Sequence, residues 1–449
     1  MTKHTMDLTT GSVTKKLMLF TLPILASNLL QHFYNAADTV VVGKFANDTA
    51  LAAVGSTGSL TALILSLFTG LAAGTNVVCA NHYGARNREK LRNCMHTSVL
   101  LGVICGIGLA IVGVALARPL QVMMGSPESV IDQAVLYVRI YFCGVPASLV
   151  YNFAAAILRA HGDTKRPMII LALSGVVNVL LNLLFVIVLH MDVAGVALAT
   201  IISQYLSMAA ALHLLYDPKG ECAMQKSEMR LDKEATLEIV RIGVPSGING
   251  AMFSLSNVIV QSTINSFGDI IMAGNAASGS IGGFVCLTAA AFSTACVSFA
   301  GQCRGAKQYK RIDKLLVSSS IGGVVGVCIV SVVITLLPRT LLGLYSSNPE
   351  VIESAVEKTI LISWGYVLYA VAENAAGCLR GMGYSTMPTI LNICGICIPR
   401  VLWIYCVFPW YPTYFMLNLC FPVSWLISMV LQVWYYLHIR KKLRKVVAW

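Results

Sequence analysis

Long apolar runs alternate with short charged loops along the whole chain. About twelve of the runs are long enough to cross a bilayer, since roughly 20 apolar residues of helix span the hydrocarbon. The pattern therefore predicts an all-α membrane protein with about twelve transmembrane helices. The expected spans are 17–42, 52–78, 94–117, 131–157, 167–189, 193–216, 237–265, 271–299, 315–337, 352–378, 387–408 and 414–437.

Lys and Arg gather in every second loop between these runs. The alternate loops hold only Lys44, Arg118 and Arg339. Cytoplasmic loops are the ones enriched in Lys and Arg, so an even number of spans places both termini in the cytoplasm. We expect a multi-pass protein of a prokaryotic plasma or inner membrane. The net charge of +12 lies in these loops, so it does not indicate nucleic-acid binding.

Composition and motifs narrow the function further. The chain is 57% hydrophobic and 12% charged, whereas soluble domains carry about 25% charged residues. The sequence has no GxxxxGK[ST] phosphate loop, no HExxH and no GxSxG. We therefore expect neither an enzyme nor a nucleotide-driven pump, and an ion gradient remains as the energy source. The fourteen Cys lie mostly inside apolar runs and do not predict a disulfide framework.

The two halves of the chain resemble each other. The segment LRAHGDTKRPMI from Leu158 matches LRGMGYSTMPTI from Leu379, and the same 221-residue shift superposes Gly84-Ala85 on Gly305-Ala306. Six spans in each copy give a parallel repeat, with a pseudo-two-fold axis along the membrane normal and a site between the copies. We expect two pseudo-symmetric six-helix lobes around a central cavity. Their bounds are 1–216 and 236–449, joined by a polar cytoplasmic linker, 217–235.

The expected first span carries a polar stripe. Asp38 is the main functional candidate there, because a carboxylate inside a spanning helix costs about 2.5–3.5 kcal/mol on insertion scales. The alternative is that Asp38 caps the helix or pairs with a basic neighbour. Pro23 lies in the same helix and can kink it. The stripe recurs at three- and four-residue steps, which places it on one helix face: Asn28, Gln31, Tyr34, Asn35 and Asp38.

Other spans carry polar residues at helical spacing. Asn178 and Asn182 share a face of the fifth span, and Tyr369 and Glu373 share a face of the tenth. Hydrogen bonds between helices are the alternative for the amides, and Arg139 or Arg400 could pair with an acid. The spans contain two acids, Asp38 and Glu373, and few basic residues that could neutralise them. This balance of charge favours a cavity that accepts cations. The expected lining residues are Gln31, Asn35, Asn257, Gln261, Tyr369 and Glu373.

The first-span pattern resembles the multidrug and toxic compound extrusion (MATE) transporters. The residues that carry the likeness are Pro23 with Tyr34-Asn35-Ala-Ala-Asp38, the two Gly-Ala pairs and the two LRxxG elements. The chain looks most like the DinF-like branch, which includes MepA-like exporters. The resemblance implies antiport by alternating access: an organic, often cationic, drug leaves as H+ or Na+ enters.

The resemblance also implies roles for single residues. Asp38 becomes the coupling residue, with Tyr34 one turn below it, and Pro23 lets the helix bend. The fifth span of that branch often reads Asn-xxx-Asp, whereas this chain has Asn178 and Asn182, which leaves the ion and its stoichiometry open. The coupling set is then Asp38, Tyr34, Asn178 and Asn182.

Two other functions are open at this point. A lipid-linked oligosaccharide flippase shares the twin-lobe plan, but it would need a basic cavity for pyrophosphate. An inert membrane scaffold or receptor would not need the polar stripes. The expected partners are small-molecule drugs or organic cations and the lipid bilayer, with no nucleic acid. No cofactor is expected beyond H+ or Na+, no metal beyond Na+ at Asp38, and nothing in the sequence requires more than a monomer.

Overall fold

The chain folds into long helices joined by short turns. The structure, a computed structural model, describes residues 5–45, 48–123, 128–218 and 223–446. Within these ranges it leaves out the side chains of 35, 37–40, 42–65, 123, 128–130, 226 and 446. The described ranges contain helices and turns and no strand, which confirms the all-α prediction.

The helices of the first half follow the expected spans. The first four extend beyond their apolar runs at both ends, because the connecting turns are short. They are α1 (Val13–Phe45), α2 (Asp48–Gly84), α3 (Arg88–Met123), α4 (Glu128–Ala160), α5 (Lys165–Asn182), which continues as a π-helical segment (Leu183–Val188), and α6 (Asp192–Tyr216).

The second half repeats this series after a short 3-10 turn (Lys226–Glu228). Its last two spans are broken into shorter helical pieces. The elements are α7 (Lys233–Asn265), α8 (Asp269–Gly305), α9 (Tyr309–Leu336), α10 (Pro338–Gly343), α11 (Pro349–Gly381), α12 (Thr386–Asn392), α13 (Ile398–Leu402), α14 (Tyr414–Asn418) and α15 (Cys420–Val446), with π-helical segments at Ile393–Cys397 and Trp403–Val407 and a 3-10 turn at Phe408–Trp410.

The helix lengths suit a membrane. Helices α1, α4, α7 and α11 have 33 residues each, or about 50 Å, whereas the hydrocarbon is about 30 Å thick. In the described part of the chain, 10 helical segments are long and apolar enough to cross a bilayer. The long helices α2 and α7 complete the expected twelve spans.

The internal repeat is visible in the backbone. Helices α2 and α8 are offset by 221 residues at both ends, and so are α4 and α11. The same offset relates two left-handed glycines, Gly162 (φ 86°) and Gly383 (φ 82°), and two left-handed basic residues, Arg86 (φ 56°) and Lys307 (φ 57°). Since left-handed φ is unfavourable for residues with a Cβ, its recurrence at Arg86 and Lys307 is strong evidence for one turn built twice.

Contacts divide the chain into two compact units. Unit 1 comprises Met1–Asp7 and Ala26–Gly247, and unit 2 comprises Leu8–Leu25 and Ile248–Trp449. Two helices therefore contribute to both units: α1 changes unit shortly after Pro23, and α7 changes unit shortly after Pro245. A proline inside a helix removes one backbone hydrogen bond and weakens the helix locally.

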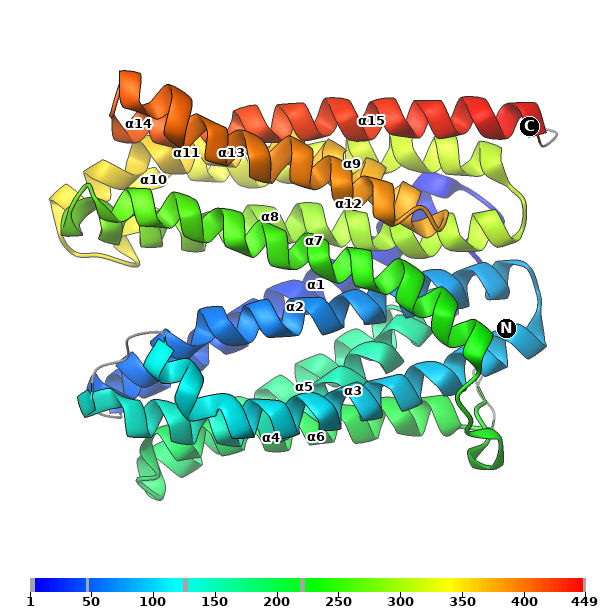
Figure 1. Ribbon diagram of the computed structural model, residues 1–449, viewed down its shortest axis with the longest axis horizontal. Helices are drawn as coiled ribbons and strands as arrows, with labels where there is room; N and C mark the ends of the chain where they lie inside the picture. Colours follow the sequence, from blue (N-terminus) through cyan, green and yellow to red (C-terminus); the bar gives the residue numbers. More distant parts are fainter. Residues whose placement is uncertain (1–4, 46–47, 124–127, 219–222, 447–449) are drawn as a thin grey trace. The chain divides into compact units, whose positions relative to one another are not determined.

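Unit 1 is built around α4, which packs against α2, α3 and α6 (Figure 1). Small residues allow close approach. A Cβ on Gly106 of α3 would lie 2.6 Å from Pro146 Cα of α4, and a Cβ on Gly70 of α2 would lie 2.2 Å from Gly247 N of α7. The first half of α7 thus packs directly on α2.

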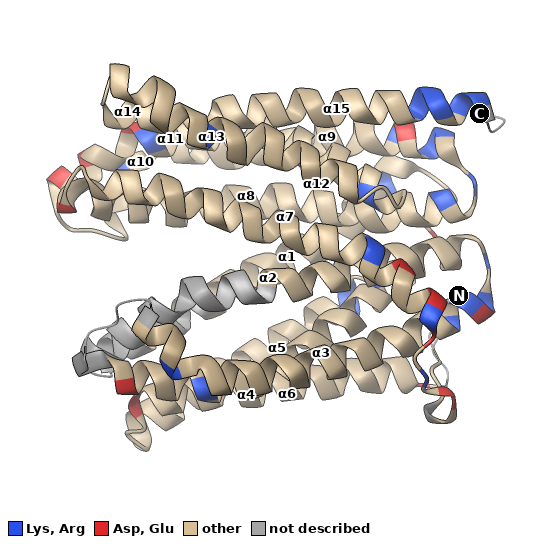
Figure 2. Ribbon diagram, in the orientation of Figure 1, with Lys and Arg blue, Asp and Glu red and all other residues tan. Residues whose placement is uncertain are grey.

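Unit 2 is built around α11, the counterpart of α4. Helix α11 runs alongside α8, α9 and α15 (Figure 1), and a Cβ on its Gly381 would lie 2.6 Å from Val297 O of α8. Figure 2 shows that the basic residues between α8 and α9 and those at the end of α15 gather at one end of this unit. The helix centres carry few charges, so the exceptions mark candidate sites.

Candidate functional site

In unit 1, Tyr34 of α1 lies directly against α5. Its hydroxyl donates a hydrogen bond to Ala172 O at 2.9 Å. Its ring covers Gly175, where a Cβ would lie only 1.8 Å from Tyr34 Cε2. Because any other residue at Gly175 would overlap the ring, this glycine fixes how closely the two helices approach.

The amides of α5 lie just beyond this contact. Asn178 and Asn182 are both buried, and Asn182 Nδ2 donates to Asn178 Oδ1 at 3.3 Å. Asn178 Nδ2 in turn donates to Thr200 Oγ1 of α6 at 3.5 Å. The structure thus brings Tyr34 close to the Asn178 region and links the two predicted amides to each other.

The remaining residues predicted on α1 are less defined. The side chains of Asp38 and Asn35 lie outside the described residues, although the backbone there is helical. Gln31 is exposed. Pro23 lies inside α1, close to the point where the helix passes from unit 2 to unit 1.

In unit 2, Glu373 of α11 forms an ion pair with Arg380. Arg380 lies seven residues after Glu373 on the same helix, and its Nη2 is 2.6 Å from Glu373 Oε2. The expectation that Arg400 pairs with an acid is wrong for this carboxylate, since the pair is made by an Arg that sequence reasoning had counted with the loops. Arg139 is exposed and is not its partner either. The charge of Glu373 is therefore compensated where it stands.

A chain of hydrogen bonds completes the surroundings of Glu373. Asn392 Nδ2 donates to Glu373 Oε1 at 3.1 Å. The other end of that amide, Asn392 Oδ1, accepts from Ser428 Oγ at 2.8 Å and from Gln432 Nε2 at 3.0 Å. The Glu373 carboxylate and Asn392 Oδ1 thus both accept hydrogen bonds, whereas Gln432 Oε1 is buried without a partner in the described structure.

Arg400 of α13 is buried inside unit 2 with 1% of its surface exposed. Its Nε donates to Ser424 Oγ at 3.1 Å, and its Nη1 donates to Asn257 Oδ1 at 2.9 Å. The guanidinium carbon lies 4.5 Å from the ring centre of Phe421 and 5.8 Å from that of Trp425. Asn257, predicted to line a cavity, thus orients a buried cation.

Lys358 of α11 is a second buried base, 6% exposed. Its Nζ donates to Asn275 Oδ1 and lies 5.7 Å from the ring centre of Phe421. Asn275 Nδ2 donates to Gln261 Oε1 at 2.7 Å. Gln261, another predicted residue, therefore acts on Lys358 through Asn275.

Tyr369 belongs to an aromatic cluster beside these cations. Its ring centre lies 5.8 Å from Tyr366, 5.7 Å from Trp425 and 6.3 Å from Phe253. Tyr366 and Trp425 are 4.6 Å apart. These spacings are typical of interacting aromatic rings. The cluster links the predicted Tyr369 to the side chains around Arg400.

Sequence reasoning missed the balance of charge in unit 2. The expectation of few bases inside the spans is wrong for unit 2, because Lys358 and Arg400 are buried inside expected spans and Arg380 is largely buried just past the end of one. The signal was present: Lys358 stands inside the expected span 352–378, and Arg400 inside 387–408.

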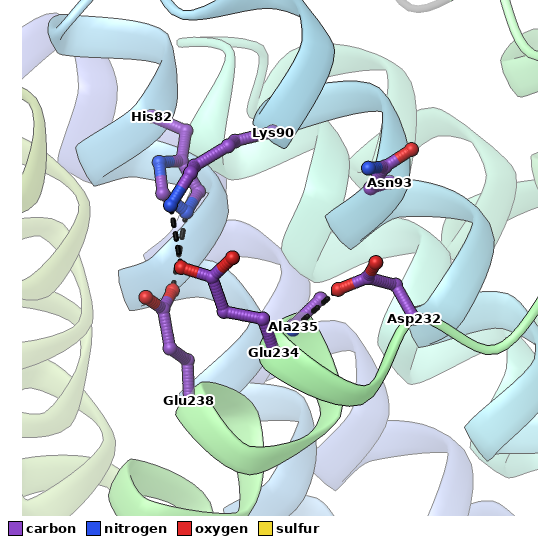
Figure 3. Close-up of a pocket in the computed structure, with 7 residues that line it drawn as sticks. All are labelled: His82, Lys90, Asn93, Asp232, Glu234, Ala235 and Glu238. Atoms are coloured by element: carbon purple, nitrogen blue, oxygen red, sulfur yellow. Dashed lines mark hydrogen bonds and ion pairs between the residues drawn. The ribbon is translucent and has the colours of Figure 1, made fainter.

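A small polar pocket lies at one end of unit 1, where α7 begins (Figure 3). His82 Nε2 lies 3.1 Å from Glu238 Oε2, and Lys90 Nζ lies 2.5 Å from Glu234 Oε1. Asp232 caps α7, since its Oδ1 accepts from Ala235 N at 2.8 Å, which satisfies an end group of the helix. The pairs tie the start of α7 to α2 and α3, so we interpret the pocket as a structural clamp.

No metal centre is found in the described part of the chain, where no three His, Cys, Asp or Glu side chains are grouped to hold an ion. The Na+ expected at Asp38 falls outside this test, because that side chain is not described.

Comparison with known proteins identifies the architecture. A model of the MatE family matches residues 23–184 and 245–405, one stretch in each half. A probable multidrug resistance protein, YoeA of Bacillus subtilis, is 29% identical over 399 residues, which cover 86% of this chain and 85% of the relative. A FAD transporter of Shewanella oneidensis is 22% identical over 355 residues, which cover 76% of this chain and 78% of that protein.

The fold has a close match among solved structures. A structure described as the outward-facing conformation of a multidrug resistance MATE family transporter of the MOP superfamily superposes with a TM-score of 0.92. It is 22% identical, and the superposition covers 99% of both chains. The likeness extends over the whole fold.

Proposed function

Because the chain belongs to the MatE family of membrane transporters, we propose that it exports small organic compounds in exchange for H+ or Na+. It is a multi-pass membrane protein and a transporter, not an enzyme. The observation that carries the proposal is the family match in both halves of the chain, together with the multidrug resistance protein that is similar over most of its length.

Coupling is assigned to Asp38, with Tyr34, Asn178 and Asn182 as its neighbours. The contact of Tyr34 with α5 supports this set, because it holds the Asp38-bearing stretch of α1 near the two amides. A carboxylate in a low dielectric favours its neutral form, so it takes up a proton readily. With amide and hydroxyl oxygens nearby it would instead bind Na+, which prefers oxygen ligands as other hard cations do.

Alternating access follows from competition at this carboxylate. An organic cation and the coupling ion neutralise the same charge, so binding of one favours release of the other. Pro23 is the natural bending point of α1, because the helix leaves unit 2 for unit 1 close to it. We further propose that both termini face the cytoplasm, on the strength of the Lys and Arg bias of the loops.

A lipid-linked oligosaccharide flippase is the second candidate. The buried bases Arg400 and Lys358 favour it, because they supply the positive charge that a pyrophosphate group needs and that the sequence had seemed to lack. The paired state of Glu373 adds to this, since a neutralised carboxylate does not attract an organic cation.

The test is ethidium export from cells that lack their own exporters, driven by an imposed pH step and then by a Na+ step. We expect export with the wild type under one of the two steps, and loss of export with Asp38→Asn. Glu353→Gln is the matched control, since it removes an exposed carboxylate that pairs with an exposed arginine, and it should retain ion-driven export. Coupled export by Asp38→Asn would refute the assignment, and no export by the wild type would favour the flippase.

A further inference from the structure

We propose that unit 2 contains a binding site for an organic anion, in which Arg400, Lys358 and Trp425 hold a carboxylate or phosphate group carried by an aromatic molecule. The proposal goes beyond the proposed function, because this anion site in unit 2 is separate from the Asp38 carboxylate at which an organic cation would compete, and it rests on that function only for the direction of transport.

The charges of the buried residues are the first argument. Arg380 compensates Glu373, whereas neither Arg400 nor Lys358 takes part in an ion pair among the described residues. An arginine side chain stays protonated in proteins, and a buried charge without a counter-charge is costly. Unit 2 therefore holds excess positive charge that an anionic ligand would compensate.

Unused hydrogen-bond donors are the second argument. Arg400 Nη2 and Trp425 Nε1 are buried and have no hydrogen-bond partner in the described structure, and both residues are only 1% exposed. Both groups can donate but cannot accept, so a ligand that satisfies them must supply acceptor atoms. A carboxylate or phosphate offers several lone pairs and suits a guanidinium especially well.

The site is also oriented in advance. Asn257 and Ser424 occupy Nη1 and Nε of Arg400, which leaves Nη2 as the free donor. Asn275 positions Lys358 in the same way. Phe421 lies 4.5 Å from the Arg400 guanidinium and 5.7 Å from Lys358 Nζ, so both cations flank one ring. Fixing donors before a ligand arrives lowers the entropy lost on binding.

The aromatic part of the ligand follows from the neighbouring rings. Tyr366, Tyr369 and Phe253 are each only partly buried and surround Trp425 and Arg400. Partly exposed rings next to a cation favour a planar ligand that stacks while its acidic group reaches the donors. A purely structural role for Arg400, joining Asn257 to Ser424, would need neither the free Nη2 nor the unpaired Trp425 N–H.

The test uses two dyes with the same xanthene core and opposite charge. We would measure binding of 5-carboxyfluorescein, an anion, and rhodamine 123, a cation, to the purified full-length protein in detergent by fluorescence polarisation. The wild type should bind the anion. Arg400→Gln should weaken that binding about tenfold or more, since a hydrogen bond to a charged group contributes roughly this much. Rhodamine 123 binding should not weaken.

Further variants separate binding from folding. Trp425→Phe keeps the ring and removes the N–H, Lys358→Gln removes the second charge, and Arg400→Lys keeps the charge but loses the fork. Each should weaken anion binding less than Arg400→Gln while leaving the gel-filtration profile unchanged. The control Arg339→Gln removes an exposed arginine and should bind as the wild type does.

Two results would overturn the proposal. In the first, the wild type does not bind 5-carboxyfluorescein. In the second, the variants at Arg400, Lys358 and Trp425 all bind it as tightly as the wild type does. If Arg400→Gln does not fold, the Trp425 and Lys358 variants decide the question. Binding is measured without an ion gradient, so its failure is distinct from a failure of ethidium export, which would refute the proposed function instead.

Discussion

Arg380→Met should destabilise unit 2 strongly, because it leaves Glu373 as a buried carboxylate without its cation. The two side chains are only 16% and 11% exposed, and their closest atoms lie 2.6 Å apart. Removing one partner of such a pair typically costs about 3–5 kcal/mol. Asn392 and Ser293 remain as donors to the carboxylate, so we expect the lower part of that range.

The predicted change in melting temperature follows from this free energy. For a unit of about 150–250 residues, 1 kcal/mol shifts the midpoint by roughly 2–4 °C. A loss of about 3 kcal/mol should therefore lower it by roughly 6–12 °C. The double variant Glu373→Leu with Arg380→Met should recover most of this loss, since apolar residues often replace a buried ion pair with little effect.

Thermal unfolding in detergent can be followed with a thiol-reactive dye after the exposed thiols are blocked. Cys378 of α11 is fully buried and becomes reactive when unit 2 unfolds. The matched control is Arg339→Met, whose pair with Glu353 is 67% and 63% exposed, so its loss should leave the melting temperature nearly unchanged. The single variant Glu373→Leu completes the comparison. If the double variant loses as much free energy of unfolding as Arg380→Met and Glu373→Leu do together, the two side chains are not coupled.

Gly175→Leu should disrupt the packing of α1 on α5, because even a Cβ at this position would overlap the Tyr34 ring. The free energy of unfolding should fall by about 1–3 kcal/mol or more. The melting temperature should fall with it, and adding Tyr34→Ala should partly restore it. Gly383→Ala should lower the free energy of unfolding by about 1–2 kcal/mol, because the backbone at Gly383 has a left-handed φ of 82°, which is unfavourable for a residue with a Cβ. An unchanged melting temperature would contradict this prediction. Lys90→Met should change the melting temperature only slightly, because the Lys90–Glu234 pair is 45% and 65% exposed and exposed ion pairs contribute little. The difference from the wild type should shrink further in high salt.

The helices and the repeat could be predicted from the sequence. Apolar runs have a length set by the bilayer, and a duplicated turn preserves its glycines, as Gly162 and Gly383 do. The helix ends were less predictable, since α2 and α11 continue beyond the hydrocarbon into short turns. The left-handed backbone at Arg86 and Lys307 could not be predicted from the residue type, since Arg and Lys do not favour this conformation.

The partners of the charged residues were the part that sequence reasoning missed. Arg380 follows Glu373 by seven residues on one helix, so helical periodicity alone could have paired them. Arg400 and Asn257 are 143 residues apart, and only tertiary packing brings them together. Lys358 was visible as a base in a span, but Phe421 and Asn275 come from other helices. The functional role of Asp38, the main candidate, stays a prediction.

The passage of α1 and α7 from one unit to the other has a consequence for the origin of the chain. Unit 1 is completed by the first half of α7, and unit 2 by the first half of α1. Two copies of a half-length ancestor with one repeat could complete both units by exchanging their first helices, as in a domain-swapped dimer. Gene fusion would then have turned an exchange between two chains into one within a single chain. Either repeat expressed alone should leave a unit unfinished, and the two fragments should fold only when produced together.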